Sequence, residues 1–245
     1  MSEHPITDYR KVFFEKYRTT HLEQMYGKED IRNIKINSPV WDWYYGSLLP
    51  RDKFLKIADL GCGIGGFVYW LRSLGYANVV GVDISRENCD YAASLGIEGI
   101  IHSDLGQFLS GCGGYDVIVM RDVLEHLNKT EILSTLASTH HILNPGGMLL
   151  LQIPNAESLF GAKCRYSDFT HEVSFTGSSI KQVLSVTGFS SVSLKETGPV
   201  PHGIKSLLRW VAWLCFRGII SGYSLVEGGA ASGLYTQTLI ACAKK

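Results

Sequence analysis

The sequence predicts an open, doubly wound α/β domain, and two features of its pattern are the reason. From Lys53 to Asn155, short apolar runs typical of buried strands alternate with amphipathic stretches typical of helices. Strands that are apolar on both faces and separated by helices indicate a parallel sheet covered on two sides. The first strand also ends in a glycine-rich turn before a helix, which is where such sheets bind ligands.

Five strands are expected in this region, with helices between most of them. The strands are expected at 54–60, 78–83, 99–104, 115–122 and 147–155, and the helices at 65–74, 86–95 and 129–143. Ser85 is placed to cap the second of these helices, and Pro145 and Gly146 end the third. A further helix at 179–187 and strands at 190–196 and 234–245 are expected toward the end of the chain.

The flanking segments divide the chain into a cap and a main domain. Residues 1–50 are rich in aromatic and charged side chains, show helical spacing at 9–17 and 22–25, and are too short to fold alone, so we expect a helical cap. Residues 51–245 form the main domain, with its core at 53–155, a polar loop at about 156–178 and an insertion at 198–232. The apolar stretch 207–220 is interpreted as a buried helix, a homodimer contact or a peripheral membrane contact.

Composition narrows the class of protein. The chain has 245 residues with 23 basic and 23 acidic side chains, and its net charge of zero argues against a broad nucleic-acid-binding face. Six cysteines are scattered without metal-ligand spacing, no segment is long and apolar enough to span a membrane, and the first residues lack the apolar core of a secretory signal. We therefore expect a cytoplasmic protein without a membrane span.

The glycine turn after the first strand reads Asp59-Leu-Gly61-Cys62-Gly63-Ile-Gly65-Gly66. Three of its glycines match the G-x-G-x-x-G pattern of dinucleotide sites, and a purely structural turn is the plain alternative. A carboxylate just before the turn would repel a pyrophosphate, however, whereas it suits a ligand with an ammonium group.

Two more carboxylates follow the next two strands. Asp83 ends the second strand, where an acidic side chain commonly binds two ribose hydroxyls, and Asp104 follows the third strand, where it can accept from an adenine amino group. Capping of the next helix is the structural alternative for both. Because all three carboxylates lie at the carboxyl edge of the sheet, a ligand with an ammonium, a ribose and an adenine would satisfy them together.

Five motifs in this order carry a family resemblance: ADLGCGIGG, GVDIS, SDL, YDVIVMRDVLEHL and LNPGGMLLLQIPN. Over roughly residues 53–155 the chain resembles the class I S-adenosylmethionine-dependent methyltransferases. The resemblance implies S-adenosylmethionine as cofactor. It also implies a Rossmann-like seven-stranded sheet of order 3-2-1-4-5-7-6 with an antiparallel seventh strand, for which residues 234–243 are suited.

The resemblance also implies a set of cofactor-binding residues. The glycine turn should line the methionine and ribose, Asp83 should hold the ribose hydroxyls, and Ile84 should pack on the adenine. The expected set is Asp59, Gly61, Cys62, Gly63, Gly65, Asp83, Ile84, Asp104, Leu105 and Arg121. Arg121 follows the fourth strand beside the methionine end, and Asp104 and Leu105 flank the adenine.

A hydroxyl acceptor needs a base to remove its proton, and two histidines are candidates. His171 lies in SDFTHEVSFTGSSIKQVLSVTGF, which resembles a pattern of methyltransferases from polysaccharide and lipopolysaccharide gene clusters, and it is the first choice. His126, in RDVLEHL, is the second. For either histidine, a packing or backbone-bonding role is the alternative.

Other side chains extend the hypotheses about the acceptor. Asp122, Glu125 and His126 resemble the acidic-x-x-E-H run of ubiquinone-pathway O-methyltransferases and offer an alternative metal site, although we expect no metal. The aromatic residues at 41–45 are suited to stack on a sugar or to pack under the cap.

The resulting hypothesis is an S-adenosylmethionine-dependent O-methyltransferase with a histidine base. The most favoured acceptor is a sugar hydroxyl of a surface polysaccharide or its precursor, hence a small molecule or glycan and not a nucleic acid. The alternatives are an O-methyltransferase of a phenolic or quinone-like molecule, metal-assisted or not, and a catalytically silent cofactor-binding scaffold.

Overall fold

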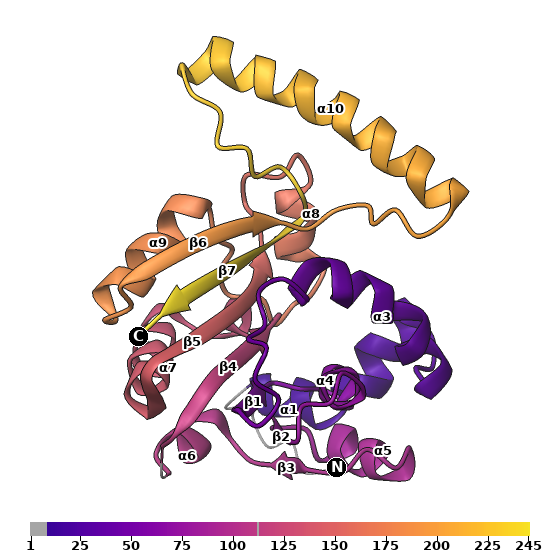
Figure 1. Cartoon of the computed structure of the whole chain (residues 1–245), viewed down its shortest axis with the longest axis vertical. Coiled ribbons are helices and arrows are strands. Elements are labelled where there is room, and N and C mark those ends of the chain that lie inside the picture. Colours follow the sequence, from indigo (N-terminus) through magenta and orange to yellow (C-terminus); the bar gives the residue numbers. More distant parts are fainter. Residues whose placement is uncertain (1–8, 112) are drawn as a thin grey trace, which may run out of the picture.

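The computed structural model describes residues 9–111 and 113–245, and a single seven-stranded sheet organises them (Figure 1). The strand order is β3-β2-β1-β4-β5-β7-β6, and β7 runs antiparallel to both of its neighbours, which confirms the predicted sheet. The strands are β1 (Lys56–Leu60), β2 (Asn78–Asp83), β3 (Ile100–His102), β4 (Tyr115–Arg121), β5 (Leu143–Pro154), β6 (Ser191–Glu196) and β7 (Thr238–Lys244).

Helices cover both faces of the sheet, because the central strands are apolar on both sides. One core cluster joins the sheet to α6 (Leu105–Leu109), α7 (Lys129–Ile142) and α9 (Gly177–Val186). The other joins it to α3 (Ile31–Tyr45), α4 (Gly66–Ser73) and α5 (Arg86–Ser94). The long runs of fully buried residues in β1 and β4 arise from this double cover.

The segment before β1 is helical, as expected for a cap, but its parts differ in their role. α1 (Tyr9–Glu15), a π-helical turn η1 (Arg18–Leu22) and α2 (Glu23–Tyr26) lie at the carboxyl edge of the sheet. α3 instead belongs to the core, since Ile34 and Tyr45 are fully buried. Its start is capped by Asp30, whose side chain accepts from the Asn33 N–H at 2.8 Å.

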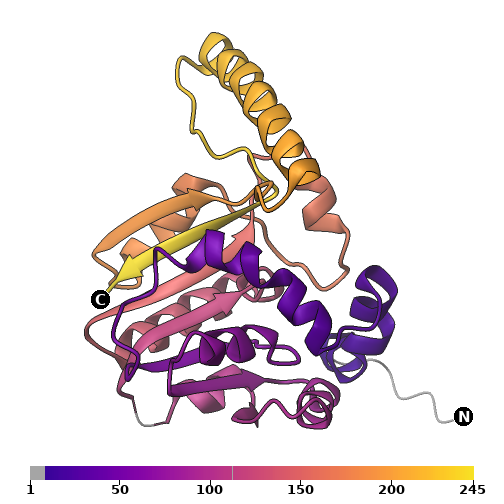
Figure 2. The same ribbon diagram turned by 45° about the vertical axis from the view of Figure 1, so that its right-hand side comes forward.

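Two short elements complete the carboxyl edge, and a long helix lies beyond it. A 3₁₀ turn η2 (Leu124–His126) follows β4, and α8 (Gly161–Tyr166) follows β5. The insertion forms α10 (Ile204–Gly228), a 25-residue helix that stands away from the sheet in both views (Figures 1 and 2). The interpretation of 207–220 as a buried helix is wrong, because Ser206 is the only buried residue of α10. Apolar composition alone cannot show whether a neighbour covers a helix.

Candidate active site

A cavity of about 1370 Å³ lies at the carboxyl edge of the sheet, with a wall formed by η1 and its neighbours. Eight of the ten cofactor-binding residues expected from the sequence line it: Asp59, Gly61, Gly63, Asp83, Ile84, Asp104, Leu105 and Arg121. Cys62 and Gly65 do not, because the Cys62 side chain points toward β2, where its Sγ would lie 2.7 Å from a Cβ at Gly81. Cys62 is thus a packing residue at the back of the turn.

The glycine turn has a backbone that other residues would not tolerate. Gly61 has φ +72°, and a Cβ there would lie 2.4 Å from Val123 Cγ2. Gly63 has φ +57° but no atom within 4 Å of a Cβ, so its face toward the cavity is open. The Gly63 N–H donates to Asp83 Oδ2 at 2.7 Å, which ties the turn to the end of β2.

Asp83 has the rest of its carboxylate held as well. Oδ1 accepts from the Ser85 N–H at 2.8 Å and from Asn88 Nδ2 at 3.2 Å. Burial raises the pKa of Asp83, and these donors oppose the rise. Ser85 caps α5, so Asp83 is not needed as that cap, whereas Asp104 does cap α6 through the N–H groups of Gly106 and Gln107.

Asp59 and Arg121 form the charged centre of the cavity. Asp59 is only 2% exposed, and burial raises its pKa to about 7 although Arg121 opposes the rise. The Arg121 guanidinium lies 4.6 Å from the ring centre of Phe67 and 5.3 Å from that of Trp41, and its Nε has no hydrogen-bond partner among the described residues. Cation–π contacts therefore position the arginine.

This arrangement answers the question about the aromatic residues at 41–45. Trp41 and Tyr45 pack against α4 and Arg121 and are at most 9% exposed, so they do not stack on an acceptor. Tyr44 binds the backbone of Gly198 through its hydroxyl, and Trp43 is 49% exposed. The cluster joins α3 to the domain.

Asp122 has the one positive φ angle found at a non-glycine residue among those described, at +55°. Such a conformation is costly for a residue with a Cβ and clusters at functional sites. Its Oδ2 accepts from Gln152 Nε2 at 2.7 Å, and Gln152 Oε1 accepts from the Tyr45 hydroxyl at 2.6 Å. The chain thus turns sharply after β4 and presents the Asp122 carboxylate at the cavity.

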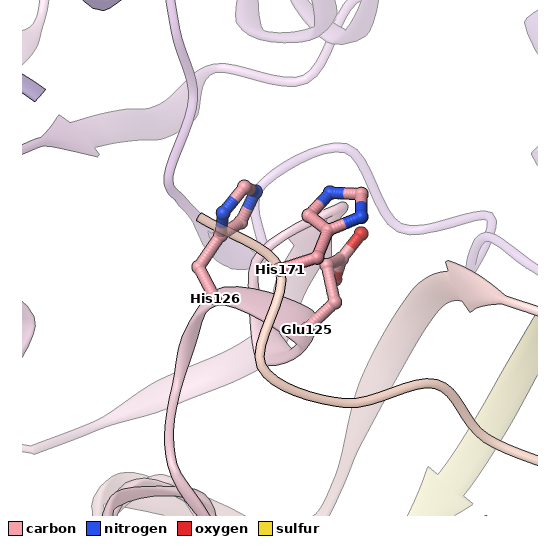
Figure 3. A group of neighbouring side chains, drawn as sticks. All are labelled: Glu125, His126 and His171. Carbon is pink, nitrogen blue, oxygen red and sulfur yellow. The ribbon is translucent and has the colours of Figure 1, made fainter. Parts of the chain in front are cut away.

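His126 and His171 meet at the other end of the cavity, with ring centres 4.7 Å apart. Figure 3 shows Glu125 and His126 on the turn after β4 and His171 on the facing loop. One ligand atom from each of the three lies within 4.8 Å of the others, so this group can hold a metal ion. Asp122, part of the trio considered from the sequence, is replaced in this group by His171.

The tautomer of each histidine follows from its neighbour. His171 Nδ1 lies 3.0 Å from the Cys164 carbonyl, which can only accept, so Nδ1 carries the proton. Thr170 donates its hydroxyl to Asp168 at 2.7 Å, so the Thr170 oxygen, 2.8 Å from His126 Nδ1, accepts there. Both rings consequently carry a free lone pair on Nε2.

The protonation state favours that reading. Burial lowers the pKa of His126 to about 4 and also lowers that of His171, so both rings are neutral at pH 7. Glu125 is 1% exposed, its Oε2 has no hydrogen-bond partner in the described structure, and burial raises its pKa. A buried glutamate with a raised pKa thus lies beside two neutral imidazoles.

Three further residues shape this end of the cavity. Tyr17 donates its hydroxyl to Asp168 Oδ2 at 2.6 Å and its ring lies edge-on to His126. The Thr170 N–H donates to Asp168 Oδ1 at 2.8 Å, a local turn that the D-x-T-H spacing already signals. Nothing in the sequence places Tyr17, because its contact with Asp168 crosses 151 residues.

Comparison with known proteins agrees with the fold. A family model described as a methyltransferase domain matches residues 45–194. Phosphoethanolamine N-methyltransferase 1 of Arabidopsis thaliana is 28% identical over 154 residues. The matched region makes up 58% of this chain but only 30% of that protein. The Zea mays enzyme of the same name matches similarly, with 28% identity over 153 residues.

Solved structures show the same fold. A SAM-dependent methyltransferase from Archaeoglobus fulgidus superimposes with a TM-score of 0.65 at 18% identity, over 97% of this chain and 100% of that one. Magnesium protoporphyrin IX methyltransferase from Synechocystis, with bound SAH, gives 0.58 at 16% identity over 97% and 100%. The chain belongs to the methyltransferase-domain family, with the fold of the class I enzymes that take their methyl group from S-adenosylmethionine.

Proposed function

We propose that this protein methylates a hydroxyl group, and that the acceptor is a sugar of a surface polysaccharide or its precursor. The observation that carries the proposal is the Nε2 lone pair of His171 at the cavity: the Nδ1 bond to the Cys164 carbonyl fixes the tautomer, and burial lowers the pKa of the ring. A hydroxyl is a poor nucleophile until its proton is removed, whereas a neutral imidazole accepts that proton readily.

The residues fit S-adenosylmethionine at the glycine end of the cavity. Gly63 leaves an open floor, and Asp59 and Asp83 offer carboxylates for its ammonium and ribose hydroxyls. When bound, the cofactor supplies an electrophilic methyl group on a sulfonium that leaves as a neutral thioether.

The protein's own groups then align the acceptor. His171 Nε2 takes the hydroxyl proton as the acceptor oxygen gains the methyl group, and His126 Nε2 is the alternative base. Tyr17 and its neighbours on η1 restrict the access of water at this end of the cavity. The acceptor hydroxyl is then aligned with the methyl group and is less solvated. Cavities for one small ligand usually have about 300–1,000 Å³. This cavity is larger, which supports a site with room for both the cofactor and an acceptor.

The sugar acceptor is supported by the polar loop 167–176 and by the resemblance of its D-x-T-H segment to methyltransferases of polysaccharide clusters. A transfer assay with methyl-labelled cofactor tests it, using host extract separated into nucleotide sugars, glycolipid with polysaccharide, and organic-soluble metabolites, with and without chelator. Chelator-insensitive label in the saccharide fractions is the expected result. Absence of label from every saccharide fraction would refute the sugar acceptor.

A metal-assisted O-methyltransferase of a phenolic or quinone-like molecule is the second candidate. The grouping of Glu125, His126 and His171, with an unpartnered carboxyl oxygen on Glu125, favours it. In the same assay this candidate predicts label in the organic fraction that chelator abolishes and added divalent metal restores. Phosphoethanolamine, the acceptor that the names of the plant relatives imply for those proteins, is included as a separate arm because it is an amine.

A further inference from the structure

α10 has almost no support from the rest of the molecule. Its contacts to the body lie on one side: Arg217 pairs with Glu196 at 2.8 Å and donates to the Gly233 carbonyl at 3.2 Å, Ser221 accepts from the Tyr235 hydroxyl at 3.3 Å, and Trp213 lies against Gly198. In both views the helix projects beyond the sheet and is joined to it by extended segments (Figures 1 and 2). Helices in proteins gain most of their stability from packing, so we expect a further contact on the outer surface of α10.

That outer surface is apolar over its whole length. Ten large apolar side chains of α10 are between 43% and 89% exposed: Ile204, Leu207, Leu208, Val211, Leu214, Phe216, Ile219, Tyr223, Leu225 and Val226. At 3.6 residues per turn they surround more than half of the helix circumference. Monomeric soluble proteins rarely expose contiguous apolar surface on this scale, so the face marks a docking surface.

The width of this apolar face favours contact with lipid over contact with a second helix. A packed helix covers a stripe of about 100° on its partner, which would leave much of this face in water. A lipid phase covers every side chain that enters it. The border of the face also suits lipid, because Lys205 and Arg209 are exposed there and can extend to head groups while their stems stay apolar.

The charged residues near α8 and α10 also favour a lipid surface. Residues 157–167, which include α8, and 202–228, which include α10, contain the cations Lys163, Arg165, Lys205, Arg209 and Arg217 and the anions Glu157 and Glu227. Because Arg217 pairs with Glu196, four cations remain against two anions. The whole chain has a net charge of zero, so this end of the molecule is positive relative to the rest. Anionic lipid surfaces attract such a cluster.

A second exposed apolar group lies at the same end. Leu159 is 72% exposed, Phe160 59% and Tyr166 78%, all in or beside α8, which lies on the side of the sheet that faces α10 in both views (Figures 1 and 2). A plane that meets both helices is what a bilayer offers. No described helix is long and apolar enough to cross a membrane, so α10 would lie along the surface.

We propose that α10 and the α8 segment dock this protein on the surface of a lipid bilayer that contains anionic lipid. The chain runs from α10 through residues 229–236 to Gln237 and Thr238, and α8 supplies Lys163 and Cys164; all four line the active-site cavity. The acceptor end of the cavity therefore lies close to the docking surface. A lipid-carried acceptor would reach it without leaving the bilayer.

Vesicle flotation of the full chain tests the proposal. Vesicles of phosphatidylcholine alone are compared with vesicles of equal parts phosphatidylcholine and phosphatidylglycerol. We expect flotation with both and more with the anionic vesicles, and we expect the double variant L208E/I219E to lose it roughly tenfold or more. The control is F54E, which places one glutamate on a 77%-exposed residue before β1, outside both docking segments, and it is compared with L208E and I219E singly as well as together.

Sedimentation velocity without vesicles tests whether a second copy of the chain covers α10 instead of lipid. A dimer that L208E/I219E converts to monomer, with no flotation of the original chain, would show that a second copy covers α10 and would overturn the proposal. Equal loss in F54E would overturn it too, because apolar exposure anywhere would then suffice. Cofactor binding by calorimetry checks that each variant is folded, and none of these readouts depends on the acceptor proposed above.

Discussion

His171 and His126 differ from the five other described histidines in combining a fixed tautomer with a free Nε2 at the cavity. If His171 is the base, replacing it by alanine lowers kcat by about 10²–10⁴ and leaves cofactor affinity unchanged. The readouts are turnover with the identified acceptor and calorimetric binding of S-adenosylhomocysteine. H141A, on the exposed end of α7, is the matched control. Unchanged turnover in H171A would transfer the role to His126.

The pH dependence of turnover tests the same residue. Burial lowers the pKa of His171 below its ordinary value of about 6.5, so the neutral base is fully present above that value and is lost as the pH falls further. We expect kcat to be level from pH 8 to 7 and to fall only on the acidic side of pH 6.5. A rate that keeps rising above pH 8 would contradict a histidine base.

Asp83 tests the cofactor end. Changing it to asparagine removes the charge and one acceptor for the Gly63 and Ser85 N–H groups, and we expect cofactor binding to weaken by about 1–3 kcal/mol. Calorimetry with S-adenosylhomocysteine measures the change. D90N, on the exposed face of α5, should bind like the original protein, and equal affinity in D83N would remove Asp83 from the ribose site.

Asp59 makes the site costly in the absence of ligand. Its folded pKa of about 7 lies above the unfolded value, so between about pH 4 and 7 the unfolded chain ionises while the folded carboxyl keeps its proton, and the protein loses stability as the pH rises. D59N should therefore have a higher Tm than the original chain at pH 8, with a free energy of unfolding larger by on the order of a few kcal/mol, and the difference should vanish near pH 4. The same variant should bind cofactor more weakly, which calorimetry records.

At the scale of elements, the N-terminal helices divide into two groups. Residues 9–26 form a wall of the cavity, held by contacts such as Tyr17 to Asp168, whereas α3 is part of the core. Removing residues 1–28 should leave a folded protein that binds cofactor but has a lower kcat/KM for the acceptor. Removing residues 1–50 also deletes Ile34 and Tyr45, both fully buried, and should prevent folding. Circular dichroism and the transfer assay distinguish the two outcomes.

At the scale of the whole molecule, the sheet does not depend on the insertion. β7 lies between β5 and β6 through continuous antiparallel ladders, and α10 buries only Ser206. Replacing residues 204–228 with a short glycine-serine linker should leave the Tm within about 4 °C, since a loss of about 1 kcal/mol shifts the Tm of a protein of this size by about 2–4 °C. A large fall in Tm would show that α10 supports the fold.

The family resemblance implied the strand order, whereas the sequence by itself determined the strands of the sheet and most of the residues that line the cavity at its carboxyl edge. These follow from local signals: apolar strands of limited length, glycines where the turn needs positive φ, and carboxylates at successive strand ends. The boundaries shifted by a few residues, as at β1, which begins at Lys56 and not at 54. α3 was missed because Pro39 and the aromatic run at 41–45 interrupt its apolar spacing.

Only the tertiary structure decided which distant groups meet. The pairing of His126 with His171, the tautomers set by Thr170 and Cys164, and the wall around Tyr17 join segments that no local pattern links. The same holds for α10, because its apolar residues are compatible with a buried helix and with an exposed one. Hydrophobicity states that a surface avoids water, but only the packed chain shows which surfaces it has left uncovered.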